Sequence, residues 1–245
     1  QKPEFSAEAL FLGDFTLDFE TYITDQFPLR DGFVALSSLT ERALLKTDVE
    51  GVYIGSDGLL VTALEEPNET LLNANMRAVE SFAVSLDIPV CLAIVPTAAG
   101  IYPEKLPANA QTADQTELLG IIRENTPSAL WVDLFDTLAA VKSEYILFNT
   151  DHHWTSRGAY AGYAATAQAL GLEPEPIGET FETLSTFYGT AASAAGWMRG
   201  EGDTVELYAD AENVTVTAVE NGQSFEVPVY DLSFADKKDK YCVFF

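Results

Sequence analysis

The sequence predicts an α/β fold, on the evidence of three features in its middle section. Residues 88–95 form a continuous apolar run of strand length, which is typical of a strand in a parallel sheet covered on both faces. A helical pattern precedes it at 68–86, and another follows at 111–125. A second short strand is predicted at 130–134, before a helix at 135–141. This alternation indicates an α/β domain over residues 51–172.

The first 50 residues are predicted to be a helical segment packed on the core. An apolar stripe (Leu17, Phe19, Tyr22, Ile23, Phe27) ends at Pro28, and a second helical pattern runs from Phe33 to about Lys46. Residues 51–61 then predict a hairpin, because two apolar runs flank a turn that ends in Asp57-Gly58.

The pattern changes after Gly171. Residues 173–178 are rich in Glu and Pro and are interpreted as a linker or loop. The segments 204–208, 214–219 and 225–230 are short strands separated by turns such as Asn221-Gly222. We therefore expect residues 173–245 to form a small antiparallel β subdomain. The chain closes on the apolar run 241–245, interpreted as an edge strand or as a fold that continues past Phe245.

Composition excludes several partners. The 245 residues carry 38 acidic side chains against 13 Lys and Arg, a net charge of −25, so no basic surface is available for nucleic acid or an anionic membrane. No run approaches the ~18 apolar residues of a membrane span. The chain starts at Gln1 with no secretory signal pattern. Cys91 and Cys242 lie in apolar runs and are interpreted as small core residues.

Both histidines of the protein are adjacent, in the segment 149–158. The segment follows an apolar run that ends at Phe148 and precedes a helix rich in Ala and Gly, so Asp151 to Thr155 is predicted to be a loop leading into a helix. Thr155 is the expected N-cap, and Asp151 would lie just before the positive end of that helix.

Three functions are compatible with these residue types. Asp-x-His spacing lets a carboxylate fix the imidazole tautomer for acid–base work on a nucleophilic hydroxyl. Asp151, His152 and His153 could bind a metal, although adjacent histidines are expected to point apart and no other His or Cys cluster completes a site. The third possibility is a purely structural role, in which His152 and His153 cap the loop and pack on Trp154. We expect no metal and no cofactor.

The segment Asp151-His152-His153-Trp154-Thr155 resembles the signature of the bacterial DHHW proteins. Residues 22–30, 52–58 and 95–97 resemble that family's amino-terminal motif, hairpin and strand-end loop. The family is similar to the SGNH-hydrolase-like enzymes that O-acetylate alginate and related cell-envelope polysaccharides. The resemblance therefore implies a three-layer α/β/α sandwich with a parallel central sheet and a Ser-His-Asp triad.

The same resemblance assigns roles. Asp151 would orient His153, and His153 would be the general base, whereas His152 occupies the variable position and receives no catalytic role. Trp154, Arg157 and Tyr188 are expected to bind substrate, with Trp154 either bracing the loop or facing the sugar.

The nucleophile departs from the family pattern. In acetyltransferase-like members it follows the Asp-x-His motif, in an Asp-Ser setting after a strand. The later serines of this chain lack that setting (Ser156, Ser185, Ser193, Ser224, Ser233). We therefore expect the catalytic serine to lie beyond Phe245.

The resemblance implies an acyl-ester enzyme, an O-acetyltransferase or acetylesterase acting on a cell-surface glycan. The alternative is a non-catalytic carbohydrate-binding or scaffolding protein of the same fold. The resemblance to the family also implies an extracellular or cell-surface location. It further implies anchoring through a segment outside this chain and a membrane-bound acyl-transfer partner. It does not specify an oligomeric state.

Overall fold

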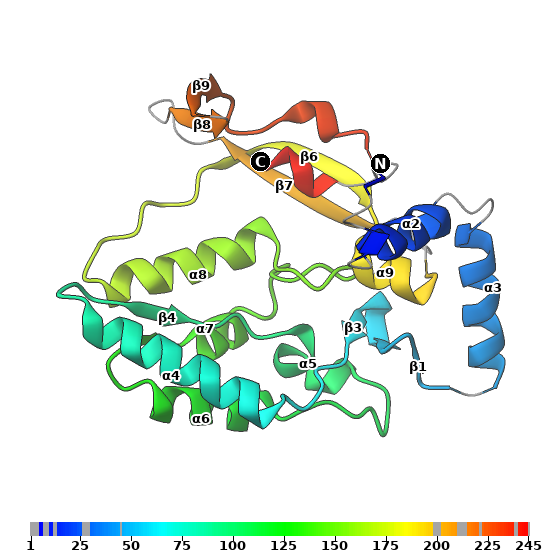
Figure 1. Cartoon of the computed structure of the whole chain (residues 1–245), viewed down its shortest axis with the longest axis horizontal. Helices are drawn as coiled ribbons and strands as arrows, with labels where there is room; N and C mark the ends of the chain where they lie inside the picture. The colour runs from blue at the N-terminus through cyan, green and yellow to red at the C-terminus, as the bar shows by residue number, and fades with distance from the viewer. Residues whose placement is uncertain are drawn as a thin grey trace.

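Helix α8 (Ser156–Ala169) lies between two parts of the molecule (Figure 1). It contacts β5 (Leu130–Val132) and α7 (Leu134–Ala140) on one side and β7 (Asp203–Ala209) on the other. The computed structural model describes residues 5–6, 10–11, 14–25, 30–44, 46–197, 202–209, 215–220, 222–237 and 240–244. The mixed α/β class predicted from the sequence is confirmed.

The α/β part follows the predicted order. Strand β4 (Cys91–Ala93) pairs in parallel with β5, and the helices α4 (Glu69–Ser85) and α6 (Gln115–Asn125) pack together beside them. The short helices α5 (Ala98–Ile101) and η2 (Pro103–Lys105) follow β4.

The prediction of a parallel central sheet holds for one strand pair only within the described residues. Both strands are shorter than predicted, for local reasons. Pro89 has no N–H to donate to a ladder, so β4 begins at Cys91. Asp133 accepts a hydrogen bond from the Asp136 backbone N–H, and this cap ends β5 at Val132 by starting α7.

The predicted hairpin forms, with one additional short strand. β1 (Asp48–Val49), β2 (Val52–Ile54) and β3 (Leu60–Thr62) make an antiparallel sheet, with the 3₁₀ turn η1 (Ser56–Gly58) between the last two. Asp57 and Gly58 have φ of 59° and 79°, which explains the Asp-Gly pair at this turn.

The predicted amino-terminal helices are α2 (Asp14–Asp25) and α3 (Arg30–Ala43). Helix α3 contacts β1 and α9 (Thr190–Ala195), so it packs on the body of the protein. The predicted helix break at Phe27-Pro28 lies outside the described residues, as do Asn221 and Phe245.

Antiparallel pairs form the carboxyl-terminal part. β6 (Glu179–Phe187) pairs with β7, and β8 (Val216–Glu220) pairs with β9 (Gln223–Val227). The last three of these strands were predicted, but β6 and α9 were not. The 3₁₀ turns η3 (Leu232–Phe234) and η4 (Lys240–Val243) follow, so the closing apolar run is not an edge strand over its described residues. The division at residue 172 stays a prediction.

A hydrophobic cluster ties the end of the chain to the histidine segment. Its buried members come from the loop before the histidines, from β6 and β7, and from η4 (Phe148, Leu184, Phe187, Val205, Leu207, Val243). Cys91 and Cys242, interpreted from the sequence as small core residues, are both half-buried. None of the described helices is long and apolar enough to cross a bilayer.

Candidate active site

The histidines lie on a narrow loop between α7 and α8. The loop runs out toward α9 and returns, as the paired ribbons at the centre of Figure 1 show. Thr155 N–H donates to the Ile146 carbonyl at 2.9 Å, and Phe148 N–H donates to the His153 carbonyl at 3.2 Å. Thr155 caps α8 as predicted, with its Oγ1 accepting from Gly158 N–H.

Trp154 anchors the returning limb of the loop. Its ring packs on a core cluster, and a Cβ placed on Gly162 would lie 2.8 Å from ring atom Cζ3. A Cβ on Gly158 would lie 2.2 Å from the Ile146 carbonyl oxygen. The two glycines therefore let helix α8 approach the loop closely.

A buried carboxylate holds the outgoing limb. Asp203, 2% exposed, accepts at Oδ1 from Tyr145 Oη (2.6 Å), Asn149 N (2.8 Å) and Asn149 Nδ2 (3.2 Å). Its Oδ2 accepts from Thr150 N at 2.6 Å and from Thr150 Oγ1 at 2.5 Å. Burial and the bond to Asp203 raise the pKa of Tyr145. The hydrogen bonds fix the backbone immediately before Asp151.

Asp151 and His153 form the predicted acid–imidazole pair. Asp151 is 3% exposed, and its Oδ1 lies 2.5 Å from His153 Nδ1 and 3.0 Å from His153 N. Burial raises the pKa of the Asp151 carboxyl, but donors from Thr190 and His153 outweigh burial and lower it overall. An ionised Asp151 places a proton on His153 Nδ1, which leaves Nε2 as the basic nitrogen of the neutral ring.

The second carboxylate oxygen faces the start of α9. Asp151 Oδ2 accepts from Thr190 N at 2.7 Å and from Thr190 Oγ1 at 3.0 Å. Asp151 precedes α8 in the chain as expected, and its carboxylate contacts the start of a second helix, α9. Thr190 is 39 residues from Asp151, and no local sequence pattern indicates this contact.

His152 and His153 do not point apart as expected. Their rings lie side by side, with centroids 3.9 Å apart and planes tilted by 35°, because the loop turns at the position where an extended strand would alternate. Among the described residues, Asp151, His152 and His153 are the one His, Cys, Asp or Glu group able to converge on a metal ion. Both Nδ1 atoms are already hydrogen-bonded, so a metal bound through Nδ1 would replace those bonds.

Tyr241 also packs against the His153 ring. The two ring centroids lie 4.7 Å apart, and Tyr241 Oη donates to the Trp154 carbonyl at 3.3 Å. Burial and the Asp151 charge raise the pKa of Tyr241. The His153 side chain remains 44% exposed, so its ring contacts two neighbouring rings and is still open to solvent.

The remaining predicted site residues lie around the loop. Arg157 forms two bonds with Glu206 on β7, Nε to Oε2 at 2.7 Å and Nη2 to Oε1 at 2.8 Å. Tyr188 packs beside the hairpin in a core cluster with Val52 and Leu60. Neither contact reaches Asp151 or His153, and substrate binding by these residues stays a prediction.

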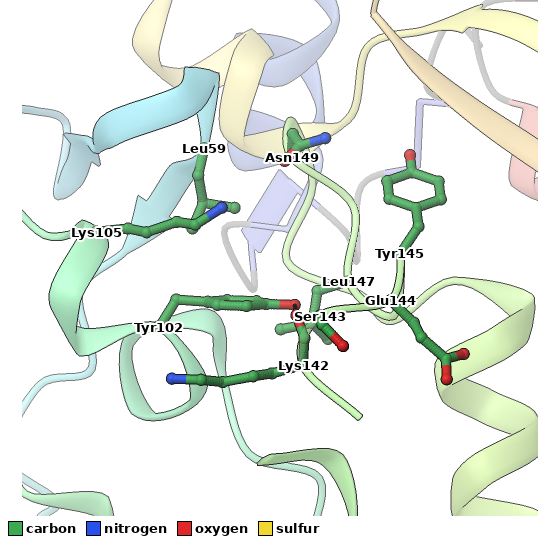
Figure 2. A pocket seen from close by; sticks show the side chains of 9 residues that line it. All are labelled: Leu59, Tyr102, Lys105, Lys142, Ser143, Glu144, Tyr145, Leu147 and Asn149. Atoms are coloured by element: carbon green, nitrogen blue, oxygen red, sulfur yellow. Dashed lines mark hydrogen bonds between the residues drawn. The ribbon is translucent and has the colours of Figure 1, made fainter. Parts of the chain in front are cut away.

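A pocket of about 250 Å³ opens beside the outgoing limb, next to Asn149 (Figure 2). Two lysines line it, but each is paired with an acid. Lys105 lies 3.6 Å from Asp57, and Lys142 lies 3.0 Å from Glu104. The charges of both lysines are therefore compensated, and Glu144 adds a carboxylate to the lining of the pocket.

Every serine of the chain lies within the described residues, and none is hydrogen-bonded to His153 there. Ser156 Oγ donates to the Glu206 carbonyl at 2.7 Å, and Ser193 lies within α9. The site consists of an acid, an oriented imidazole and their supports.

The mixed α/β fold and its carboxylate–histidine loop define an SGNH hydrolase-like protein. The chain belongs to the family described as the SGNH hydrolase-like domain of acetyltransferase AlgX, whose model matches residues 52–227. This match confirms the resemblance given by the histidine motif. A search of curated proteins found no match.

Solved structures share the fold. The O-acetyltransferase domain of Pseudomonas putida AlgJ has a TM-score of 0.51 at 22% identity, over 64% of this chain and 63% of that chain. A DHHW family protein from Eubacterium siraeum has a TM-score of 0.57 at 23% identity, over 78% and 63%. This chain thus covers less than two thirds of either structure.

Bacillus cereus PatB1 is a third neighbour, with a TM-score of 0.59 at 16% identity, over 79% of this chain and 72% of that chain. PatB1 has also been solved with a sulfonyl adduct. At these identities the likeness establishes the fold.

Proposed function

We propose that this chain supplies the acid and base of a Ser-His-Asp enzyme that transfers or removes acetyl groups on a cell-surface glycan. The observation that carries the proposal is the 2.5 Å contact between buried Asp151 Oδ1 and His153 Nδ1. It fixes one tautomer and leaves Nε2 free to take a proton. The family match supports an acyl-transfer reaction.

The nucleophile in this proposal is a serine in polypeptide that follows Phe245. His153 Nε2 takes the serine proton as the serine oxygen attacks the ester carbonyl carbon, and backbone N–H groups stabilise the oxyanion. His153 then gives the proton to the leaving oxygen. A glycan hydroxyl or water attacks the acyl-serine in the second step, losing its proton to His153, which returns it to the departing serine oxygen.

Partner and location are part of the proposal. The acceptor is a glycan at the cell surface, and the acetyl group comes from a membrane-bound partner. Family membership and the O-acetyltransferase title of the AlgJ neighbour support the acetyl transfer itself. The glycan acceptor and the membrane-bound donor rest on the resemblance of the histidine motif. Trp154, Arg157 and Tyr188 are proposed to contribute to the glycan-facing surface around the loop.

Acetyl-ester turnover tests the proposal. The protein carrying the residues after Phe245 is assayed with 4-nitrophenyl acetate and then with an acetylated glycan. His153→Ala is expected to lower kcat about 10²- to 10⁴-fold, the range for removal of a general base. Ser224→Ala, on exposed β9, is the matched control and should leave turnover unchanged. Equal rates for wild type and His153→Ala would overturn the proposal.

A further inference from the structure

One carboxylate orients both histidines. Asp151 Oδ1 contacts His153 Nδ1 directly, whereas Asp151 Oδ2 accepts from Thr190 Oγ1 at 3.0 Å. His152 Nδ1 lies 2.8 Å from the same Thr190 oxygen. Thr190 therefore links His152 to the acid that serves His153.

Counting protons along this chain of contacts fixes each donor. An ionised carboxylate only accepts, and the lowered pKa of Asp151 keeps it ionised at neutral pH. Thr190 has a single hydroxyl proton, which it donates in the hydrogen bond to Asp151 Oδ2. The contact between Thr190 Oγ1 and His152 Nδ1 then requires the histidine to donate. His152, like His153, must carry its proton on Nδ1.

The two basic nitrogens are consequently presented together. Both rings have a lone pair on Nε2 when neutral, the rings lie 3.9 Å apart, and both side chains are about half exposed. A base needs one such nitrogen. A second acceptor beside it suits a substrate with two neighbouring hydroxyl groups, as a sugar ring has.

We propose that Thr190 fixes His152 as the Nδ1–H tautomer, and that His152 Nε2 accepts a hydrogen bond from a hydroxyl of the acyl acceptor next to the one that His153 deprotonates. The second half of this proposal rests on the proposed function. The first half concerns the folded chain alone.

Nitrogen NMR of the imidazoles tests the tautomers without any activity. The chain has only two histidines, so a long-range ¹⁵N–¹H spectrum contains two ring systems. At about pH 8, where imidazoles are neutral, both should show a protonated Nδ1 and an unprotonated Nε2. Thr190→Val should shift His152 alone toward the Nε2–H form that free imidazoles prefer, and Thr190→Ser should not. Any other tautomer of wild-type His152 overturns the assignment.

Two isosteric substitutions test the contact with the acceptor. The Gln amide reaches the position of His Nε2, whereas the Asn amide reaches only that of Nδ1. In the protein with the residues after Phe245, His152→Asn should raise KM for the acceptor about tenfold, the effect of one hydrogen bond. His152→Gln should restore most of the affinity. Release of 4-nitrophenol, which reports acylation, is measured beside it, and Ser224→Ala on exposed β9 is the variant expected to leave both readouts unchanged.

Equal acceptor KM for His152→Asn and wild type would overturn the contact with the acceptor. Loss of acylation in both His152 variants would also overturn it, because that result indicates a purely structural role for His152. A wild-type protein without turnover would overturn the proposed function and the acceptor contact together. The tautomer assignment would then be decided by the NMR spectrum alone.

Discussion

Gly189 and Asp151 are in direct contact. A Cβ placed on Gly189 would lie 2.2 Å from Asp151 Oδ2 and 2.3 Å from Asp151 Cβ. The φ of Gly189 is −83°, which any residue adopts, so space and not backbone conformation requires glycine here. The absent side chain lets the first turn of α9 reach the carboxylate, and the Thr190 contacts depend on that approach.

Gly189→Ala should therefore displace either Asp151 or α9. We expect a loss of about 1–3 kcal/mol in the free energy of unfolding, measured by urea denaturation, as for other insertions into packed interiors. Gly120→Ala is the matched control, because Gly120 lies within α6 with no atom near its Cβ position, and it should be neutral or slightly stabilising. Equal stability of Gly189→Ala and wild type would refute the contact.

Asp203 should matter to stability more than its distance from the histidines suggests. Asp203→Asn replaces one accepting oxygen with a donor, so at least one of the groups on Tyr145, Asn149 and Thr150 loses its partner. The expected cost is about 1–3 kcal/mol in urea unfolding. Asp87→Asn, on an exposed residue, provides the comparison. If the two variants unfold at the same urea concentration, the anchoring role is wrong.

Acid should weaken the stabilisation that the Asp151 carboxylate gives to the folded protein. The folded-state pKa of Asp151 is lowered, so the unfolded chain binds its proton more tightly and this contribution is complete above the unfolded value of about 3.9. It is lost as pH falls through the lower folded pKa. The stability gap between wild type and Asp151→Asn should narrow below about pH 4, measured by urea unfolding at several pH values. A stability difference between wild type and Asp151→Asn that stays constant from neutral to acidic pH would contradict the lowered pKa of Asp151.

The Arg157–Glu206 pair should contribute modestly. Arg157 is partly exposed, so the bidentate bond is expected to add about 0.2–1 kcal/mol, less at high salt. A double-mutant cycle with Arg157→Gln and Glu206→Gln measures this coupling. The KM of Arg157→Gln for the acceptor then distinguishes a role of Arg157 in the ion pair from a role in binding the substrate. A KM increase that Glu206→Gln does not share would assign Arg157 to the substrate.

Local chemistry explains which elements the sequence could predict. The Asp-x-His spacing, the Thr155 cap and the Asp57-Gly58 turn depend on neighbours within a few residues, and each occurs as expected. Thr190 and Asp203 lie 39 and 53 residues from the loop residues they bind, Asp151 and Thr150. Such partners depend on the packing of α9 and β7 and leave no periodic pattern.

Strand β6 shows why a real strand can escape prediction. Its pairing with β7 shifts register between Thr180 and Glu182 and again between Leu184 and Phe187. Buried Leu184 and Phe187 are consequently three residues apart, and the alternation typical of a strand is lost. The close approach of the two histidine rings could not be predicted for a related reason, because the bent loop does not alternate its side chains.

Covalent labelling of the serine tests the central claim most directly. A sulfonyl fluoride reacts with a serine only when a base activates it, and peptide mass spectrometry locates the modified residue. In the protein carrying the residues after Phe245, we predict modification of one serine in that region, at a rate that falls at least about 100-fold in His153→Ala. Labelling at the same rate in wild type and His153→Ala, or no serine labelling in wild type, would contradict the assignment of Asp151 and His153 as the acid and base of an acyl-transfer site.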